Sequence, residues 1–194
     1  MDGRVGLNPV LQTEPVLDLW FPLTGTTVPV DHGYTLYAAL IRRLEAIDLA
    51  LAHRLHDAES FGLHRVRGVY VGGGLLEIDS AARLGLRVPA GLVPGLTRLA
   101  GSELILGEYK LRLGIPRPTM LVPASDLYAH LVTTKNGIEE VRFRQELARQ
   151  LESLGAMAEI RSVIRRTFRI KDRQIVAYST SLTIADVPSS LRVQ

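Results

Sequence analysis

The segment PVDHGYTLYAALIRRL, residues 29–44, places a histidine and two tyrosines where a helix is expected to begin. Histidine is the side chain best suited to proton transfer near neutral pH. Gly33 allows a tight turn beside His32, so the imidazole is expected on a loop that a ligand can reach. The alternative is ordinary capping, in which Asp31 accepts hydrogen bonds from the first helical turn and His32 has no chemical role. The spacing alone favours capping.

The remaining tyrosine and histidine positions are weaker candidates. Tyr34 and Tyr37 lie three residues apart, so one can point toward the loop while the other packs, and Tyr37 is the one expected in the core. His53 and His56 have a spacing that could pair on a metal ion, but no third ligand lies nearby. The last two histidines fall in expected strands, where a polar sheet edge or a structural role is favoured: His64 and His130.

The composition excludes several classes of protein. The chain has 194 residues, 46% of them hydrophobic, which is enough for one large core or two small ones. It contains no cysteine, so disulfides, thiolate zinc sites, iron–sulfur clusters and cysteine nucleophiles are ruled out. The segment VGGG, residues 71–74, lacks the lysine and helix of a phosphate loop. Without a signal-like start or a long apolar run, a cytoplasmic protein is expected.

The charge is unevenly distributed along the chain. Residues 1–114 carry 11 Lys and Arg against 12 Asp and Glu, whereas residues 115–194 carry 12 against 8. Six bases and one acid lie between Arg161 and Arg173, in RSVIRRTFRIKDR. Such a run favours a polyanionic partner, although a solvated pair of strands is an equal alternative.

Hydrophobic periodicity predicts the same order of strands and helices in the two halves of the chain. In the first half, the expected elements are a strand at 16–23, a helix at 34–51, a hairpin around 72–74 with a strand at 83–88, a helix at 92–99 and a hairpin at 104–113. This strand and helix order is that of the ferredoxin-like fold, an α+β class. In the second half, a strand at 127–134, a helix at 138–154 closed by Gly155, and strands at 158–170 and 174–184 repeat it.

The predicted boundaries follow from the proline-rich IPRP junction. Residues 1–14 form an N-terminal extension, 15–114 the first ferredoxin-like domain, 115–126 a linker and 127–194 a second, incomplete domain. Asp186 is expected to cap a short helical start, so the second domain lacks its closing strand.

The sequence resembles the CRISPR repeat-processing endoribonucleases of the repeat-associated mysterious protein superfamily, in particular the myxan-subtype branch. The resemblance runs along nearly the whole chain, through LDLWFPLTGTTVPVDHGYTLYAAL, LHRVRG, LRLGIPRPTMLVPASDLYAHLVTTK and RRTFRIKDRQIV. It implies tandem ferredoxin-like domains that cut precursor CRISPR RNA without metal or cofactor, leaving a 2′,3′-cyclic phosphate. It also implies a glycine-rich loop near the C-terminus, which the chain does not show before Gln194.

The resemblance also assigns roles to individual residues. His32 matches the catalytic histidine and becomes the expected general acid/base, with Tyr34 as its helper. Contacts to the RNA backbone are expected from the basic run, at Arg165, Arg166, Arg169, Lys171 and Arg173. Two alternatives stay open: a non-catalytic subunit that holds a repeat hairpin in an effector complex, and a small-molecule regulatory domain.

Overall fold

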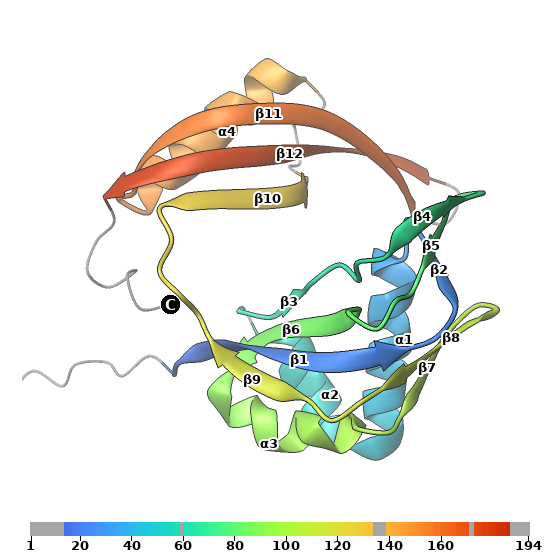
Figure 1. The fold of residues 1–194 in the computed structure, drawn as a ribbon. Helices are drawn as coiled ribbons and strands as arrows, with labels where there is room; N and C mark the ends of the chain where they lie inside the picture. Colours follow the sequence, from blue (N-terminus) through green and yellow to red (C-terminus); the bar gives the residue numbers. More distant parts are fainter. Residues whose placement is uncertain (1–13, 59, 134–138, 171–172, 187–194) are drawn as a thin grey trace, which may run out of the picture.

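The structure, a computed structural model, describes residues 14–58, 60–133, 139–170 and 173–186. Two antiparallel sheets, of six and three strands, face each other with helices over the outer face of each (Figure 1), and a third, small sheet has the strand order β2-β5-β4. The first half is α+β with the strand order β3-β6-β1-β8-β7, and β9 also pairs with β1. The second half has the order β10-β12-β11. In both halves the first strand lies beside the strand that comes third in the ferredoxin-like plan, which is β6 in the first half and β12 in the second.

The strands of the first half are β1 (Val16–Thr24), β2 (Thr27–Pro29), β3 (Gly62–Leu63), β4 (Val69–Gly72), β5 (Leu75–Glu77), β6 (Arg83–Pro89), β7 (Glu103–Leu106), β8 (Tyr109–Leu113) and β9 (Arg117–Met120). Its helices are α1 (Gly33–Ile47), α2 (Leu49–His56) and α3 (Val93–Leu96), the last flanked by the short 3-10 turns Ala90–Leu92 and Thr97–Leu99. The second half contains β10 (Asp126–Val132), α4 (Glu140–Ser153), β11 (Met157–Ile170) and β12 (Arg173–Asp186).

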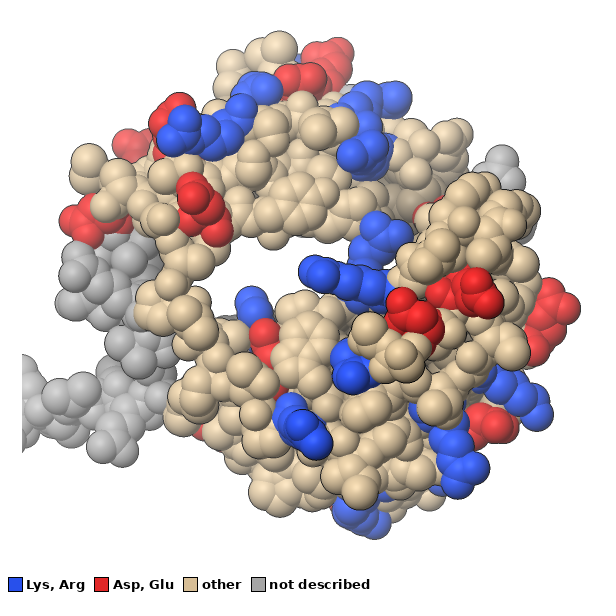
Figure 2. All heavy atoms as spheres, viewed as in Figure 1, with Lys and Arg blue, Asp and Glu red and all other residues tan. Residues whose placement is uncertain are grey.

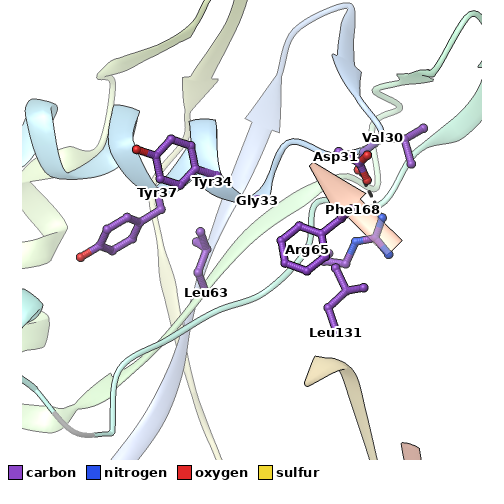
Figure 3. A pocket seen from close by; sticks show the side chains of 9 residues that line it. All are labelled: Val30, Asp31, Gly33, Tyr34, Tyr37, Leu63, Arg65, Leu131 and Phe168. Atoms are coloured by element: carbon purple, nitrogen blue, oxygen red, sulfur yellow. Dashed lines mark hydrogen bonds between the residues drawn. The ribbon is translucent and has the colours of Figure 1, made fainter. Parts of the chain in front are cut away.

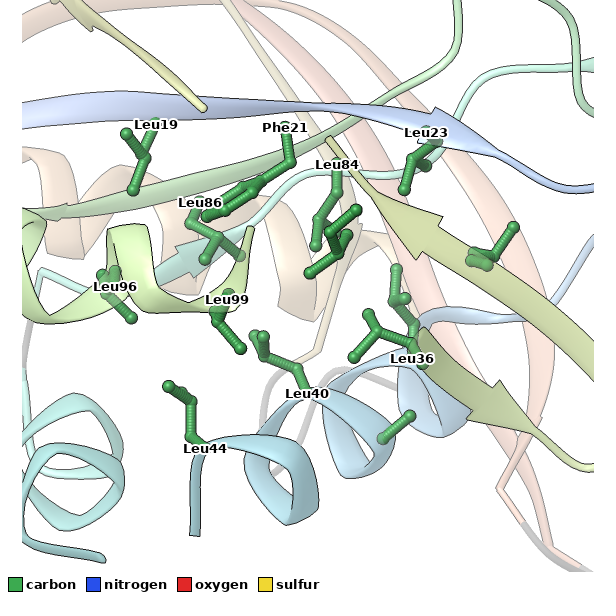
Figure 4. Packing of buried hydrophobic residues seen from close by; sticks show 14 of the residues in the cluster. Leu19, Phe21, Leu23, Leu36, Leu40, Leu44, Leu84, Leu86, Leu96 and Leu99 are labelled. Atoms are coloured by element: carbon green, nitrogen blue, oxygen red, sulfur yellow. The ribbon is translucent and has the colours of Figure 1, made fainter. Parts of the chain in front are cut away.

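The main core lies between the first sheet and its helices (Figure 4). Strand β1 buries every second residue, because successive side chains of a strand point to opposite faces. Leu36, Leu40 and Leu44 form the matching stripe on α1, and all three are fully buried. The second half has a much smaller core, in which Phe143 of α4 stacks on Tyr178 of β12 with ring centroids 4.4 Å apart.

The long helix expected at 34–51 is two helices in the structure. Asp48 is extended, with φ −162° and ψ 98°, and it ends α1 and begins α2. Its carboxylate accepts a hydrogen bond from the backbone N–H of Leu51 at 3.0 Å and pairs with Arg98 at 3.0 Å. The hydrophobic spacing of the sequence continues across this break because Leu51 and Leu55 of α2 are also buried in the main core. The break turns α2 so that its C-terminal end lies near the start of α1.

Two other expectations need correction. Asp31 does not cap α1, because the N-cap residue is His32 and no side chain caps the helix there. Residues 115–126, expected as a linker, contain β9, which continues the first sheet by pairing with β1. The helical start expected after Asp186 lies outside the described residues, and Asp186 itself ends β12.

No helix in the described part of the chain is long and apolar enough to cross a membrane.

Candidate active site

His32 is buried, with 1% of its surface exposed. Its Nδ1–H donates to the carbonyl oxygen of Pro29 at 2.7 Å, and its Nε2 accepts from the backbone N–H of Val66 at 3.1 Å. Burial lowers the pKa of His32 below its ordinary value, and the bond to Pro29 only partly opposes this. In this arrangement a neutral imidazole fastens the start of α1 to two neighbouring segments. The catalytic role expected for His32 stays a prediction.

The burial of His32 predicts a pH-dependent stability. A histidine with a lowered pKa in the folded state binds fewer protons than in the unfolded state, so folding is favoured above the unfolded pKa of about 6.5. Stability should therefore fall as the pH decreases below that value. Thermal unfolding at about pH 7.5 and 5.5 measures the difference. The difference should shrink in a His32→Ala protein, and an equal loss in both proteins would contradict the assignment.

An exposed histidine–tyrosine pair lies beside the start of α1. The Oη of Tyr37 and the Nδ1 of His56 are 2.6 Å apart, and the Tyr37 ring also contacts Phe61 with centroids 5.9 Å apart. The break at Asp48 makes this contact possible, because α2 returns His56 to the face of α1 that carries Tyr37. With Nδ1 bonded to the tyrosine, the Nε2 of His56 has no hydrogen-bond partner among the described residues. This pair can take part in proton transfer at a surface that a substrate can reach.

Tyr34 and Tyr37 line a pocket of about 410 Å³ where the two halves meet (Figure 3). Tyr34 is 48% exposed. The structure therefore brings Tyr34 to the same site as Tyr37, whereas the ring of His32 is turned away into the protein. His56 does not line the pocket itself but is joined to it through its hydrogen bond to Tyr37.

His64, the other histidine near this sheet, is engaged in an ion-pair cluster. Its Nε2 lies 3.1 Å from Asp18, and its ring contacts that of Trp20 in a tilted arrangement with centroids 4.8 Å apart. Burial raises the pKa of Asp18, but hydrogen bonds from Arg87 and His64 outweigh it and leave the pKa lowered. The carboxylate thus stays ionised and holds both partners on the exposed face of the sheet.

The two halves are joined by a hydrogen bond between Arg65 and His130. The Nη1 of Arg65 donates to Nε2 of His130 at 2.6 Å. The Nδ1 of His130 lies 3.1 Å from the hydroxyl of Ser179 and 3.2 Å from that of Tyr128. Burial, with the charges of Arg65 and Arg166, lowers the pKa of His130, so the neutral form that accepts from Arg65 is favoured. The surface is hollowed between the halves, with Lys and Arg side chains at the margin of the hollow (Figure 2).

The basic run of β11 divides between the two faces of its sheet. Arg166 reaches the hydroxyl of Ser179, on the face that carries His130. Arg165 pairs in register with Tyr178, whose ring packs under α4, and so points to the opposite face. Arg173 is exposed at the start of β12, while the Arg169 side chain and all of Lys171 lie outside what is described. The run therefore does not form one continuous surface.

Within the described ranges no three His, Asp or Glu side chains gather as a metal site. His53, expected to be a surface residue, is exposed one turn before His56.

Comparisons with known proteins agree with this architecture. The family model described as "Cas6 Crispr" matches residues 17–194. A protein of Myxococcus xanthus (strain DK1622) named "CRISPR-associated endonuclease Cas6" is 35% identical over 178 residues, covering 92% of this chain and 74% of the relative.

Solved structures share the fold at low sequence identity. One described as "An RAMP protein binding different RNA substrates" has a TM-score of 0.64 at 11% identity, over 88% of each chain. A "CRISPR associated protein Cas6" has a TM-score of 0.61 at 16% identity, over 91% of this chain and 90% of the other. The extent of the family match and the identity to the Myxococcus protein show that this chain belongs to the Cas6 family of CRISPR-associated proteins.

Proposed function

We propose that this protein is an endoribonuclease that cuts the repeat of precursor CRISPR RNA and needs no metal ion to do so. The observation that carries the proposal is the exposed Tyr37–His56 hydrogen bond beside the pocket between the halves. The family relationship supports this activity, because the relative from Myxococcus is named as a CRISPR-associated endonuclease. Assembly with the subunits of an effector complex and a cytoplasmic location stay predictions.

The reaction that fits this site is attack by the RNA on its own backbone. The 2′-oxygen upstream of the cut bonds to the phosphorus, its proton passes to a base, and the bond to the 5′-oxygen breaks as that oxygen takes up a proton. The products are a 2′,3′-cyclic phosphate and a 5′-hydroxyl. The Nε2 of His56 is placed to carry one of the two protons, while Tyr37 holds the imidazole in position.

Proton transfer by His32, the role implied by the family resemblance, requires a different conformation. Its imidazole would have to leave both Pro29 and Val66, which would leave a buried carbonyl and a buried N–H without partners. Tyr34 needs no such change, since its exposed ring already lines the pocket and can contact the RNA.

Cleavage of repeat RNA in excess EDTA tests the function directly. The wild-type protein should cut the repeat once, at one position, and leave a cyclic phosphate that acid converts to a mixture of 2′- and 3′-phosphates. An unrelated hairpin of equal length should stay intact. Tight binding of the repeat without any cut would instead identify a non-catalytic RNA-binding subunit.

The division of the basic run predicts different roles for two neighbouring arginines. Arg166→Ala should weaken repeat binding and lower the slope of log K against log salt by about 1, because one phosphate contact is lost. Arg165→Ala removes the same charge from the opposite face and should leave the slope nearly unchanged. Binding measured by filter retention across a salt series compares the two. Equal effects of both substitutions would show that the run acts only through its total charge.

A further inference from the structure

The pocket between the halves has two chemically distinct ends (Figure 3). Tyr34 and Tyr37 of α1 line one side, and Leu131 of β10 and Phe168 of β11 lie toward the other. The polar groups, Asp31 and Arg65, are on the same side as Phe168. A volume of about 410 Å³ falls in the roughly 300–1,000 Å³ range of small-molecule sites. The pocket can therefore receive one flat, polar-edged ring.

The backbone at Leu131 is distorted where it meets this pocket. Leu131 has φ 56°, the one non-glycine residue with positive φ in the described part of the chain, and it falls at a register shift between Ala129 and Val132. The left-handed conformation costs about 1–2 kcal/mol for a residue with a Cβ. Bulges of this kind re-aim side chains next to functional sites. Here the bulge places Leu131 in the wall of the pocket, which is an independent sign that the pocket serves a ligand.

The polar groups keep hydrogen-bonding capacity for that ligand. No hydrogen bond or ion pair of the Asp31 carboxylate is found among the described residues, so its oxygens can accept from a pair of N–H donors. Arg65 donates to His130 and to the carbonyl oxygen of Val30 at 3.3 Å, so three of its five N–H groups have no hydrogen-bond partner in the part of the chain that the structure describes. The pocket thus offers a carboxylate acceptor and a guanidinium donor beside aromatic rings.

We propose that this pocket binds the base of an unpaired guanosine of the repeat RNA, next to the bond that is cut. Guanine alone among the four bases presents two adjacent donors, N1–H and N2–H₂, to a carboxylate, and also carries the acceptors O6 and N7 that suit an arginine. Its faces would lie against aromatic side chains, as unpaired bases do in RNA-binding proteins. Because Tyr37 belongs both to the pocket and to the pair with His56, a bound base would fix the neighbouring phosphate at that pair. The inference rests on the function proposed above.

The test replaces the guanines of the repeat one at a time by inosine, which lacks only the N2 amino group. Single-turnover cleavage and binding affinity are both measured for wild type, Asp31→Asn and the control Glu45→Gln, an exposed acid elsewhere on α1. When inosine replaces one guanine flanking the cut, the cleavage rate of wild type and of the control should fall by about tenfold. Asp31→Asn should be slower on guanine and should no longer distinguish guanine from inosine at that position.

A second pair of variants tests the stacking. An abasic site at the same position should lower the cleavage rate of wild type by about tenfold or more. This decrease in rate should be smaller in Phe168→Leu, which keeps an apolar side chain but removes the ring. Tyr70→Ala, an exposed aromatic on β4 outside the pocket, should retain the full loss. Equal tolerance of inosine by wild type and Asp31→Asn at every guanine would overturn the proposal. If the proposed nuclease function were wrong, the result would be different: no RNA would be cut, while the binding affinities would still report the preference for guanine.

Discussion

Replacing His56 with alanine is expected to slow repeat cleavage on the order of 100-fold or more, because one acid/base group typically contributes that much. Affinity for the repeat should stay within a few-fold, since the side chain is exposed and, among the residues that the structure describes, it hydrogen-bonds to the side chain of Tyr37 alone. Single-turnover rates with saturating protein separate the two effects. Tyr37→Phe should cause a smaller loss, because it removes the hydroxyl that orients the imidazole but leaves His56 in place.

A matched histidine lies one turn away on the same helix. His53 is exposed on α2, so His53→Ala removes an imidazole of similar exposure without touching the pair. It should cleave at the wild-type rate. If His56→Ala cleaved as fast as His53→Ala, the pair would have no part in proton transfer.

The His32→Ala protein is expected to be less stable than wild type. The substitution leaves the Pro29 carbonyl and the Val66 N–H without partners in a buried site, at about 1–3 kcal/mol for such groups. For a chain of this size, that loss lowers Tm by several degrees, roughly 2–4 °C for each kcal/mol. Thermal unfolding followed by circular dichroism measures it, and His53→Ala again serves as the control.

The His56→Ala and His32→Ala variants together decide which of these two histidines is the acid/base. A His32→Ala protein with wild-type Tm that has lost about 100-fold in cleavage rate would restore His32 as the acid/base, the role that the family resemblance implied. A protein that is less stable but still cleaves at a temperature where it is folded would leave His32 a positioning residue for α1.

The fold could be predicted from the sequence to a considerable extent because its elements depend on local patterns. The alternation in β1 and the leucine stripe of α1 mark buried faces without knowledge of any partner. The hairpin around Gly73 and the C′ glycine at 155 were also predicted, since both need left-handed backbone, with φ 58° and 68°. Asp48 was missed because its break leaves the hydrophobic period uninterrupted.

The site was harder to predict because it depends on contacts between distant residues. Tyr37 and His56 are 19 positions apart, and only the turn between α1 and α2 brings them together. His32 looked exposed because Gly33 follows it, whereas the chain covers it with the segment at Val66. One local signal was available and not used: the twofold period of a strand already separates Arg165 from Arg166.

The most direct test of the account uses a repeat RNA with a single 2′-deoxy nucleotide upstream of the cut, incubated with wild-type protein in EDTA. The attacking oxygen is then absent, while nearly all contacts for binding remain. Affinity should stay within a few-fold of that for the unmodified repeat, and no cleavage should be detected at that position. Cleavage of the deoxy-substituted repeat, or a requirement for added Mg²⁺ with the unmodified one, would contradict the proposed mechanism.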